Sequence, residues 1–166
     1  MEQTKEQKAF MEMLSRCEGS IFKACLMFTD RHPENIKDLY QDIVCALWES
    51  WPRFRGECSE NTWVHRVAFN TAISHVRHSF KSPLFTSLDD DTCNRLTEES
   101  HSDMVNQMYQ LIDLLSDKEK TIVYLYLDRV PSREIALTLG LSESTVRHRI
   151  VRIKEKLIKL KHKTDE

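Results

Sequence analysis

The stretch that decides the fold is SREIALTLGLSESTVRHRIVRIKEKL, residues 132–157. Its first part has the apolar spacing of a short helix over about 132–139, and Gly140 follows where a left-handed residue ends many helices. After one apolar residue comes Ser142, a residue type that starts a helix by accepting a backbone N–H. This order and spacing are those of a helix-turn-helix, and we predict this motif here.

The second helix of the motif, predicted over about 143–162, has two chemically different sides. At 100° per residue, four apolar side chains form the narrow stripe typical of a side that packs on a core. They are Val146, Ile150, Ile153 and Leu157. The other side and its flanks carry hydroxyl, imidazole and guanidinium groups from Ser144, Thr145, Arg147, His148, Arg149 and Arg152. Because Arg can form two hydrogen bonds to guanine, and Ser or Thr can reach base edges or phosphates, we predict that these six residues bind DNA.

The charge of the chain is uneven. The 166 residues carry a formal net charge of −2, yet residues 143–163 hold eight Lys or Arg and two acids. A basic helix on an acidic chain fits a phosphate-binding surface. It also fits a two-helix hairpin with a solvated basic face, so charge alone does not decide between the two interpretations.

Composition favours helices throughout the chain. Three Gly and four Pro in 166 residues are about 4 %, against an average near 12 %. Strands and tight turns need these residues, which argues for an all-α fold and against sandwiches, barrels and Gly-rich phosphate loops.

Ser116 and Glu119 form the sequence pattern of a capping box. The run over 121–127 resembles a strand, but because of the capping box we predict a helix over 117–128. Another helix is predicted before it, over about 103–115.

The chain is predicted to consist of two small helical domains. Residues 1–80 form the N-terminal domain and residues 103–166 the helix-turn-helix domain. Between them, residues 81–102 have two bases, five acids and little periodicity, which predicts an acidic flexible linker. The N-terminal domain is predicted to contain four helices, at about 4–17, 20–30, 34–50 and 59–79.

The helix predicted to end near Ser79 carries a polar row between two apolar flanks. The row consists of Trp63, Arg66, Asn70, Ser74 and Arg77, and the loop before it holds Phe54 and Arg55. Aromatic rings beside Arg and Asn suit single-stranded nucleic acid, whose exposed bases stack on them. The alternative interpretation is that the two aromatic rings are core residues.

The helix over 34–50 has an acidic outer side, formed by Asp38, Gln41, Asp42, Cys45 and Glu49. This side is either a protein docking surface or a solvated helix face.

Nothing in the sequence has the length or apolarity of a membrane span, the start lacks the pattern of a signal peptide, and five scattered cysteines fit a reducing compartment. We therefore expect a cytoplasmic protein without membrane insertion.

No chemistry of an enzyme is evident. His75 and His78 share a helix side but lack a third metal ligand at helical spacing, and no Ser, Cys or His stands in a nucleophilic arrangement. The expectation is a protein that is not an enzyme, with no cofactor, no metal and no small-molecule substrate. A metal-dependent nuclease is the weaker alternative.

Both blocks resemble one known family. DLYQDI (38–43), RFRGE (53–57) and TWVHRVAFNTA (62–72) resemble the promoter-melting domain of extracytoplasmic-function (ECF) sigma factors. LSDKE (115–119), REIA (133–136), LGLS (139–142) and TVRHRI (145–150) resemble the C-terminal helix-turn-helix domain of that family. The chain departs from the family pattern at Pro131-Ser132 and at His65.

The resemblance implies a subunit that binds core RNA polymerase and directs it to promoters. The helix matching 34–50 would dock on the polymerase through Asp38, Gln41, Asp42 and Glu49. Phe54 and Asn70 would capture a flipped base of the −10 element, and the last helix would read the −35 element. Family members are often held inactive by an anti-sigma factor, which is thus an expected partner beside core polymerase and promoter DNA. The alternative is a stand-alone helix-turn-helix regulator with an N-terminal helical dimerisation or effector domain.

Overall fold

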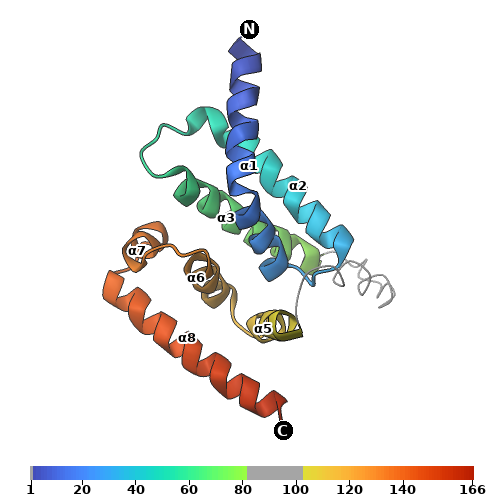
Figure 1. Ribbon diagram of the computed structural model, residues 1–166, viewed down its shortest axis with the longest axis vertical. Helices are drawn as coiled ribbons and strands as arrows, with labels where there is room; N and C mark the ends of the chain where they lie inside the picture. The colour runs from blue at the N-terminus through green and yellow to red at the C-terminus, as the bar shows by residue number, and fades with distance from the viewer. Residues whose placement is uncertain (1, 82–102) are drawn as a thin grey trace. The chain divides into compact units, whose positions relative to one another are not determined.

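The computed structural model describes residues 2–81 and 103–166, and its side chains over 4–78 and 103–166. Within these residues every regular element is a helix, which confirms the all-α prediction (Figure 1). The described residues divide into two compact units, one before and one after the segment 82–102. The predicted acidic linker lies, apart from Lys81, outside the described residues. No helix of the described residues is long and apolar enough to cross a membrane.

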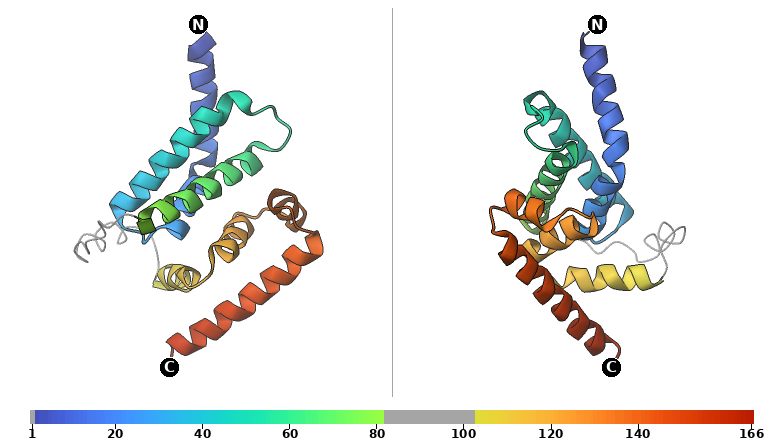
Figure 2. Two further views of the ribbon diagram at one scale, coloured as in Figure 1. Left: turned by 180° about the vertical axis from the view of Figure 1, so that it is seen from behind. Right: turned by 60° about the vertical axis from the view of Figure 1, so that its left-hand side comes forward.

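Three α-helices and one short 3₁₀ helix make up the first unit. They are α1 (Glu2–Phe28), α2 (Pro33–Ser50), η1 (Trp51–Arg53) and α3 (Glu60–Lys81). The three α-helices pack pairwise, and the N-terminal turns of α1 extend beyond the other two (Figures 1 and 2). Their shared core contains Met13, Ile21 and Met27 of α1, Leu39, Ile43 and Leu47 of α2, and Val64, Ala68 and Ala72 of α3, all inaccessible to solvent.

Helix α1 corrects one prediction. Two helices, at about 4–17 and 20–30, are predicted from the sequence, but a single helix runs through Gly19. A glycine inside a helix costs roughly 0.5–1 kcal/mol. Met13 and Ile21, on either side of Gly19, are both fully buried, and burying one such side chain contributes about 1.5–3 kcal/mol. The packing therefore outweighs the local preference for a break.

The helices predicted over about 34–50 and 59–79 are present as α2 and α3, with ends within two residues of the predicted ones. Pro33 opens α2 at its first position, and Trp51-Pro52 follows its end in a 3₁₀ turn. Ser59 caps α3 by accepting the Thr62 N–H at 3.2 Å. The segment between η1 and α3 contains Gly56 with φ of +72°, a conformation that glycine adopts without strain.

The second unit consists of α5 (Asp103–Asp113), α6 (Asp117–Leu127), α7 (Ser132–Leu139) and α8 (Glu143–Thr164). The capping box at the start of α6 is formed: the Ser116 N–H donates to Glu119 Oε2 at 2.9 Å, and the Glu119 N–H donates to Ser116 Oγ at 3.3 Å. The strand-like run over 121–127 is therefore helical, as predicted. The core gathers Tyr109 and Ile112, Ile122, Tyr124 and Leu125, Ile135, and Val146 and Ile153.

The helix-turn-helix is confirmed in its local geometry. Gly140 adopts φ of +67°, and the Leu141 N–H closes the turn by donating to the Ala136 carbonyl at 2.9 Å. Ser142 Oγ accepts the Thr145 N–H at 3.2 Å and caps α8. The left-handed Gly140 and the Ser142 cap, both predicted from the sequence, therefore form the turn between α7 and α8.

Candidate nucleic-acid interface

The polar row of α3 lies on the surface of the first unit. Arg66, Asn70, Ser74 and Arg77 are all exposed, while Val64, Ala68 and Ala72 on the same helix are buried. The helix is therefore held by its apolar sides and presents the row outward. One amide, one hydroxyl and two guanidinium groups are available there to accept and donate hydrogen bonds.

The aromatic residues at the head of this row form a stack. Phe54 contacts both Trp51 and Trp63, with ring centroids 6.1 Å and 5.0 Å away and interplanar angles of 23° and 31°. The rings of Trp51 and Trp63 are 5.8 Å apart. On the far side, Phe10 of α1 contacts Trp51 edge-on at 5.6 Å. Because all three stacked rings are half-buried, neither interpretation of Phe54 and Trp63 holds fully: they are packed, yet each keeps an accessible part.

Sequence reasoning missed Trp51 as a member of this stack. Its distance of three residues from Phe54 is the one local signal that could have linked the two rings. The contacts with Trp63 and with Phe10 join segments far apart in the sequence and need the tertiary structure.

Helix α1 fixes the start of α3 near this stack. The Arg16 guanidinium donates through Nε and Nη2 to the Glu60 carboxylate at 3.1 and 2.9 Å. At the next residue of each helix, the Cys17 thiol lies 3.5 Å from Asn61 Oδ1. Two-point contact between a guanidinium and a carboxylate restricts orientation as well as distance. These contacts restrain the first turn of α3.

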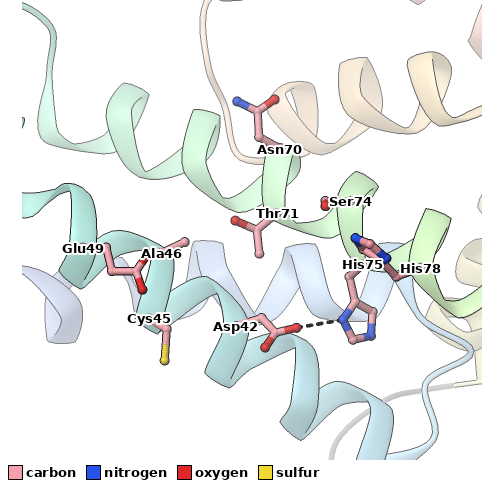
Figure 3. Close-up of a pocket in the computed structure, with 9 residues that line it drawn as sticks. All are labelled: Asp42, Cys45, Ala46, Glu49, Asn70, Thr71, Ser74, His75 and His78. Carbon is pink, nitrogen blue, oxygen red and sulfur yellow. Dashed lines mark hydrogen bonds and ion pairs between the residues drawn. The ribbon is translucent and has the colours of Figure 1, made fainter.

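A groove runs between α2 and α3 (Figure 3). Residues Asp42, Cys45, Ala46 and Glu49 line it from α2, and Asn70, Thr71, Ser74, His75 and His78 line it from α3. His75 Nδ1 and Asp42 Oδ2 are 2.9 Å apart and join the two helices. The predicted polymerase-binding side of α2 and the predicted base-contacting row of α3 therefore border one groove.

The acidic side of α2 is exposed over its whole length. Asp38, Gln41, Asp42, Cys45 and Glu49 all face solvent, opposite the buried Leu39, Ile43 and Leu47. The side chain of Asp42 contacts His75, and the other four side chains are accessible to a partner.

The cysteines that the structure describes form no disulfide. Burial raises the pKa of the Cys25 thiol to about 12, because its effect is larger than the opposing effect of a backbone hydrogen bond. That thiol therefore stays protonated inside the core.

On α8, the residues predicted to bind DNA lie outside the core. Ser144, Arg147, His148, Arg149 and Arg152 are exposed. Thr145 is half-buried, and its hydroxyl lies 2.6 Å from Ser142 Oγ within the helix cap. The stripe that faces the core is formed by Val146, Ile150 and Ile153, while Leu157 is half-buried.

Two residues on this side of α8 were missed. Glu143 and Val151 share a shallow depression with Ser144, Arg147 and His148, and Val151 is 53 % exposed. The Arg147 Nη2 donates to Glu143 Oε1 at 2.6 Å. The four-residue spacing of 143, 147 and 151 was the available signal, because it places them in one row of the helix.

Part of the basic end of α8 is used within the second unit. Lys156 Nζ lies 3.0 Å from Glu119 Oε2, and Lys154 Nζ lies 4.6 Å from the centre of the Tyr126 ring. Burial alone would raise the pKa of Glu119, but the hydrogen bond from Ser116 and the ion pair with Lys156 outweigh it and leave that pKa below its usual value. These two lysines stabilise the contact of α8 with α6.

Metal ligands do not gather in the described part of the chain. Within it, no group of three or more His, Cys, Asp or Glu could hold a metal ion. Of the histidine pair on α3, His75 lies within hydrogen-bond distance of Asp42.

Two regions of the chain match models of one protein family. Residues 14–79 match sigma-70 region 2, and residues 106–157 match sigma-70 region 4. The ECF RNA polymerase sigma-E factors of Haemophilus influenzae and of Escherichia coli K12 are each 24 % identical over 164 residues. Each match covers 90 % of this chain, and 86 % and 85 % of the respective relative.

Solved structures share the fold. CnrH, in complex with the cytosolic domain of CnrY, matches with a TM-score of 0.68 and 22 % identity over 93 % of this chain and 88 % of CnrH. RpoE of Bartonella quintana, in complex with the anti-sigma factor NepR, matches with a TM-score of 0.70 and 15 % identity over 92 % of this chain and 96 % of RpoE.

Proposed function

The chain belongs to the extracytoplasmic-function (ECF) sigma factors of RNA polymerase, and from this premise we propose that its two units divide promoter recognition between them. As a sigma factor it binds core RNA polymerase and directs initiation at promoters. In the proposal, the first unit docks on the polymerase and opens the −10 element, and the second grips the −35 element as intact duplex. Sigma factors are initiation factors, and the chain needs no catalytic residue or cofactor for this work.

The −10 role is assigned to the α3 row and the stack beside it. Flipping a base out of a duplex costs a few kcal/mol, and stacking on an aromatic ring returns roughly 1–3 kcal/mol per base. Phe54 and Trp63 supply rings, Asn70 supplies an amide for a base edge, and Arg66 and Arg77 supply charge for the backbone. The observation that carries the proposal is the exposure of this row directly beside half-buried stacked rings. Arg55 and Ser74, both exposed, complete the surface.

The −35 role is assigned to the exposed side of α8. A helix-turn-helix places the N-terminal part of its second helix against base edges in the major groove. That part of α8 carries Arg147, His148 and Arg149, with Ser144 and Thr145 in the first turn and Arg152 after them. Lys154 and Lys156 are excluded from the proposed interface, since each contacts a group of its own unit.

Docking on core polymerase is assigned to α2, through Asp38, Gln41, Asp42 and Glu49. The two solved structures named above are complexes, one with the cytosolic domain of CnrY and one with the anti-sigma factor NepR. We extend this to the present chain and propose an anti-sigma factor as a further partner. Because RNA polymerase and promoter DNA are in the bacterial cytoplasm, we propose that the chain acts there.

In vitro transcription with core polymerase tests the −10 role. We expect Asn70→Ala with Phe54→Ala to lower transcription from a fully paired promoter at least tenfold, since the double variant removes one stacking and one hydrogen-bonding group. A promoter already unpaired at the −10 element should restore much of the activity. Gln110→Ala, an exposed change on α5, should behave as the unmodified chain on both templates. Undiminished transcription by the double variant from the paired promoter would refute the assignment.

The free chain should bind promoter DNA weakly. Each unit is small and offers few contacts, and the polymerase is needed to hold both on one promoter. Tight sequence-specific binding by the isolated chain in a gel shift contradicts this division of labour.

A further inference from the structure

We propose that Glu143 is a specificity-determining residue, which acts with Arg147 to select a G·C pair in the promoter element that α8 reads. The inference rests on the proposed role of α8. It concerns a carboxylate at the first position of the helix, a group that phosphate-binding surfaces avoid because it repels DNA.

The geometry of the two side chains supports a joint role. Arg147 Nη2 donates to Glu143 Oε1 at 2.6 Å, so a donor group and an acceptor group lie side by side on the exposed part of α8. Both side chains are accessible, 68 % for Arg147 and 42 % for Glu143. They line the same depression as Ser144 and His148, which belong to the predicted DNA-binding set. The pair therefore lies within the proposed interface.

A G·C pair presents the matching groups in the major groove. Guanine offers the acceptors O6 and N7, which suit a guanidinium, and cytosine offers its N4 amino group, which suits a carboxylate. Arg147 has five N–H donors, so its bond to Glu143 leaves others for guanine. An adenine at the guanine position would place its N6 donor against the guanidinium, and thymine O4 would face the carboxylate with a second acceptor. The side-by-side pair therefore favours G·C over A·T.

The structural alternative is that the pair only stabilises the helix. A glutamate at a helix start and an i, i+4 ion pair each stabilise a helix by themselves. Neither effect depends on the base sequence of the promoter. Base preference is therefore the measurement that separates the two roles.

The test uses polymerase holoenzyme and a promoter pool with a randomised −35 region, with sequencing of the templates that are transcribed. We expect the unmodified chain to prefer G·C at one pair, Arg147→Ala to abolish that preference, and Glu143→Gln to weaken it roughly tenfold in favour of A·T, because the glutamine amide can donate to thymine O4, whereas the carboxylate can only accept. Glu155→Gln is the matched control: it removes the same charge from an exposed position of the same helix and should leave the preference unchanged. Ratios within one pool do not depend on the fraction of active protein.

Two outcomes overturn the proposal in distinguishable ways. If Arg147→Ala changes base preference and Glu143→Gln acts like Glu155→Gln, the assignment of Glu143 fails and the −35 role of α8 stands. If neither Arg147→Ala nor Arg149→Ala alters the preference at any position, the −35 role fails together with this inference.

Discussion

Neutralising Glu119 should destabilise the second unit alone, by an amount that depends on pH. Glu119 accepts the Ser116 N–H at 2.9 Å and pairs with Lys156 at 3.0 Å, with 29 % of its side chain and 46 % of the Lys156 side chain exposed. Glu119→Gln keeps the capping-box bond, because glutamine also serves at this position, and removes the ion pair. For a half-exposed pair the loss is about 0.2–1 kcal/mol. Glu119→Ala removes the hydrogen bond as well and should cost roughly 0.5–1.5 kcal/mol more.

The sign of the pH dependence follows from the lowered pKa of Glu119. The folded chain holds this carboxylate ionised to lower pH than the unfolded chain does. The stabilisation is therefore complete above the ordinary carboxyl pKa near 4.5 and is lost as pH falls through the lower value of the folded state. The difference between the unmodified chain and Glu119→Gln should shrink over that acidic range and stay constant from pH 6 to 8.

The chain offers an internal control for the assay. Its three tryptophans, Trp48, Trp51 and Trp63, all lie in the first unit. Tryptophan fluorescence therefore follows urea unfolding of that unit, and amide hydrogen exchange in α6 and α8 follows the second. We expect faster exchange in the variants with an unchanged fluorescence midpoint. Equal stability of Glu119→Gln and the unmodified chain at pH 7, or a difference that persists unchanged at pH 3, would refute the reasoning.

Two further comparisons test the fold and the polymerase-binding surface. Gly19→Ala should stabilise the first unit by roughly 0.5–1 kcal/mol in urea unfolding, because an added Cβ meets nothing within 4 Å. Gly140→Ala should instead destabilise the second unit by about 1 kcal/mol, because alanine is strained at the φ of +67° although the space around it is open. If both alanine variants stabilised the chain, or both destabilised it, backbone conformation would not be what separates the two sites. Asp42→Ala should weaken holoenzyme formation in a competition assay, whereas His75→Ala, which removes the hydrogen-bond partner of Asp42 and leaves the carboxylate in place, should leave it intact and cost less than about 1 kcal/mol in stability. Loss of polymerase binding in both variants would mean that the pair itself, and not the free carboxylate, makes the surface.

The helices and most of their ends could be predicted from the sequence because both depend on local interactions. Apolar residues at helical spacing mark the side of α8 that packs, and Ser116, Gly140 and Ser142 satisfy backbone groups within a few residues of themselves. The exposed row of α3 follows from the same 3.6-residue repeat. Gly19 shows the limit of this reasoning, because its local preference for a break is smaller than the burial energy of the residues around it.

The contacts that shape the candidate sites join segments far apart in the chain, and only the tertiary structure decides them. Arg16 pairs with Glu60 across 44 residues and Lys156 with Glu119 across 37, and His75 of α3 meets Asp42 of α2. Spacing along one helix carries no information about which side chain of another helix will lie opposite. That is set by how the helices pack, through the summed burial of many apolar residues.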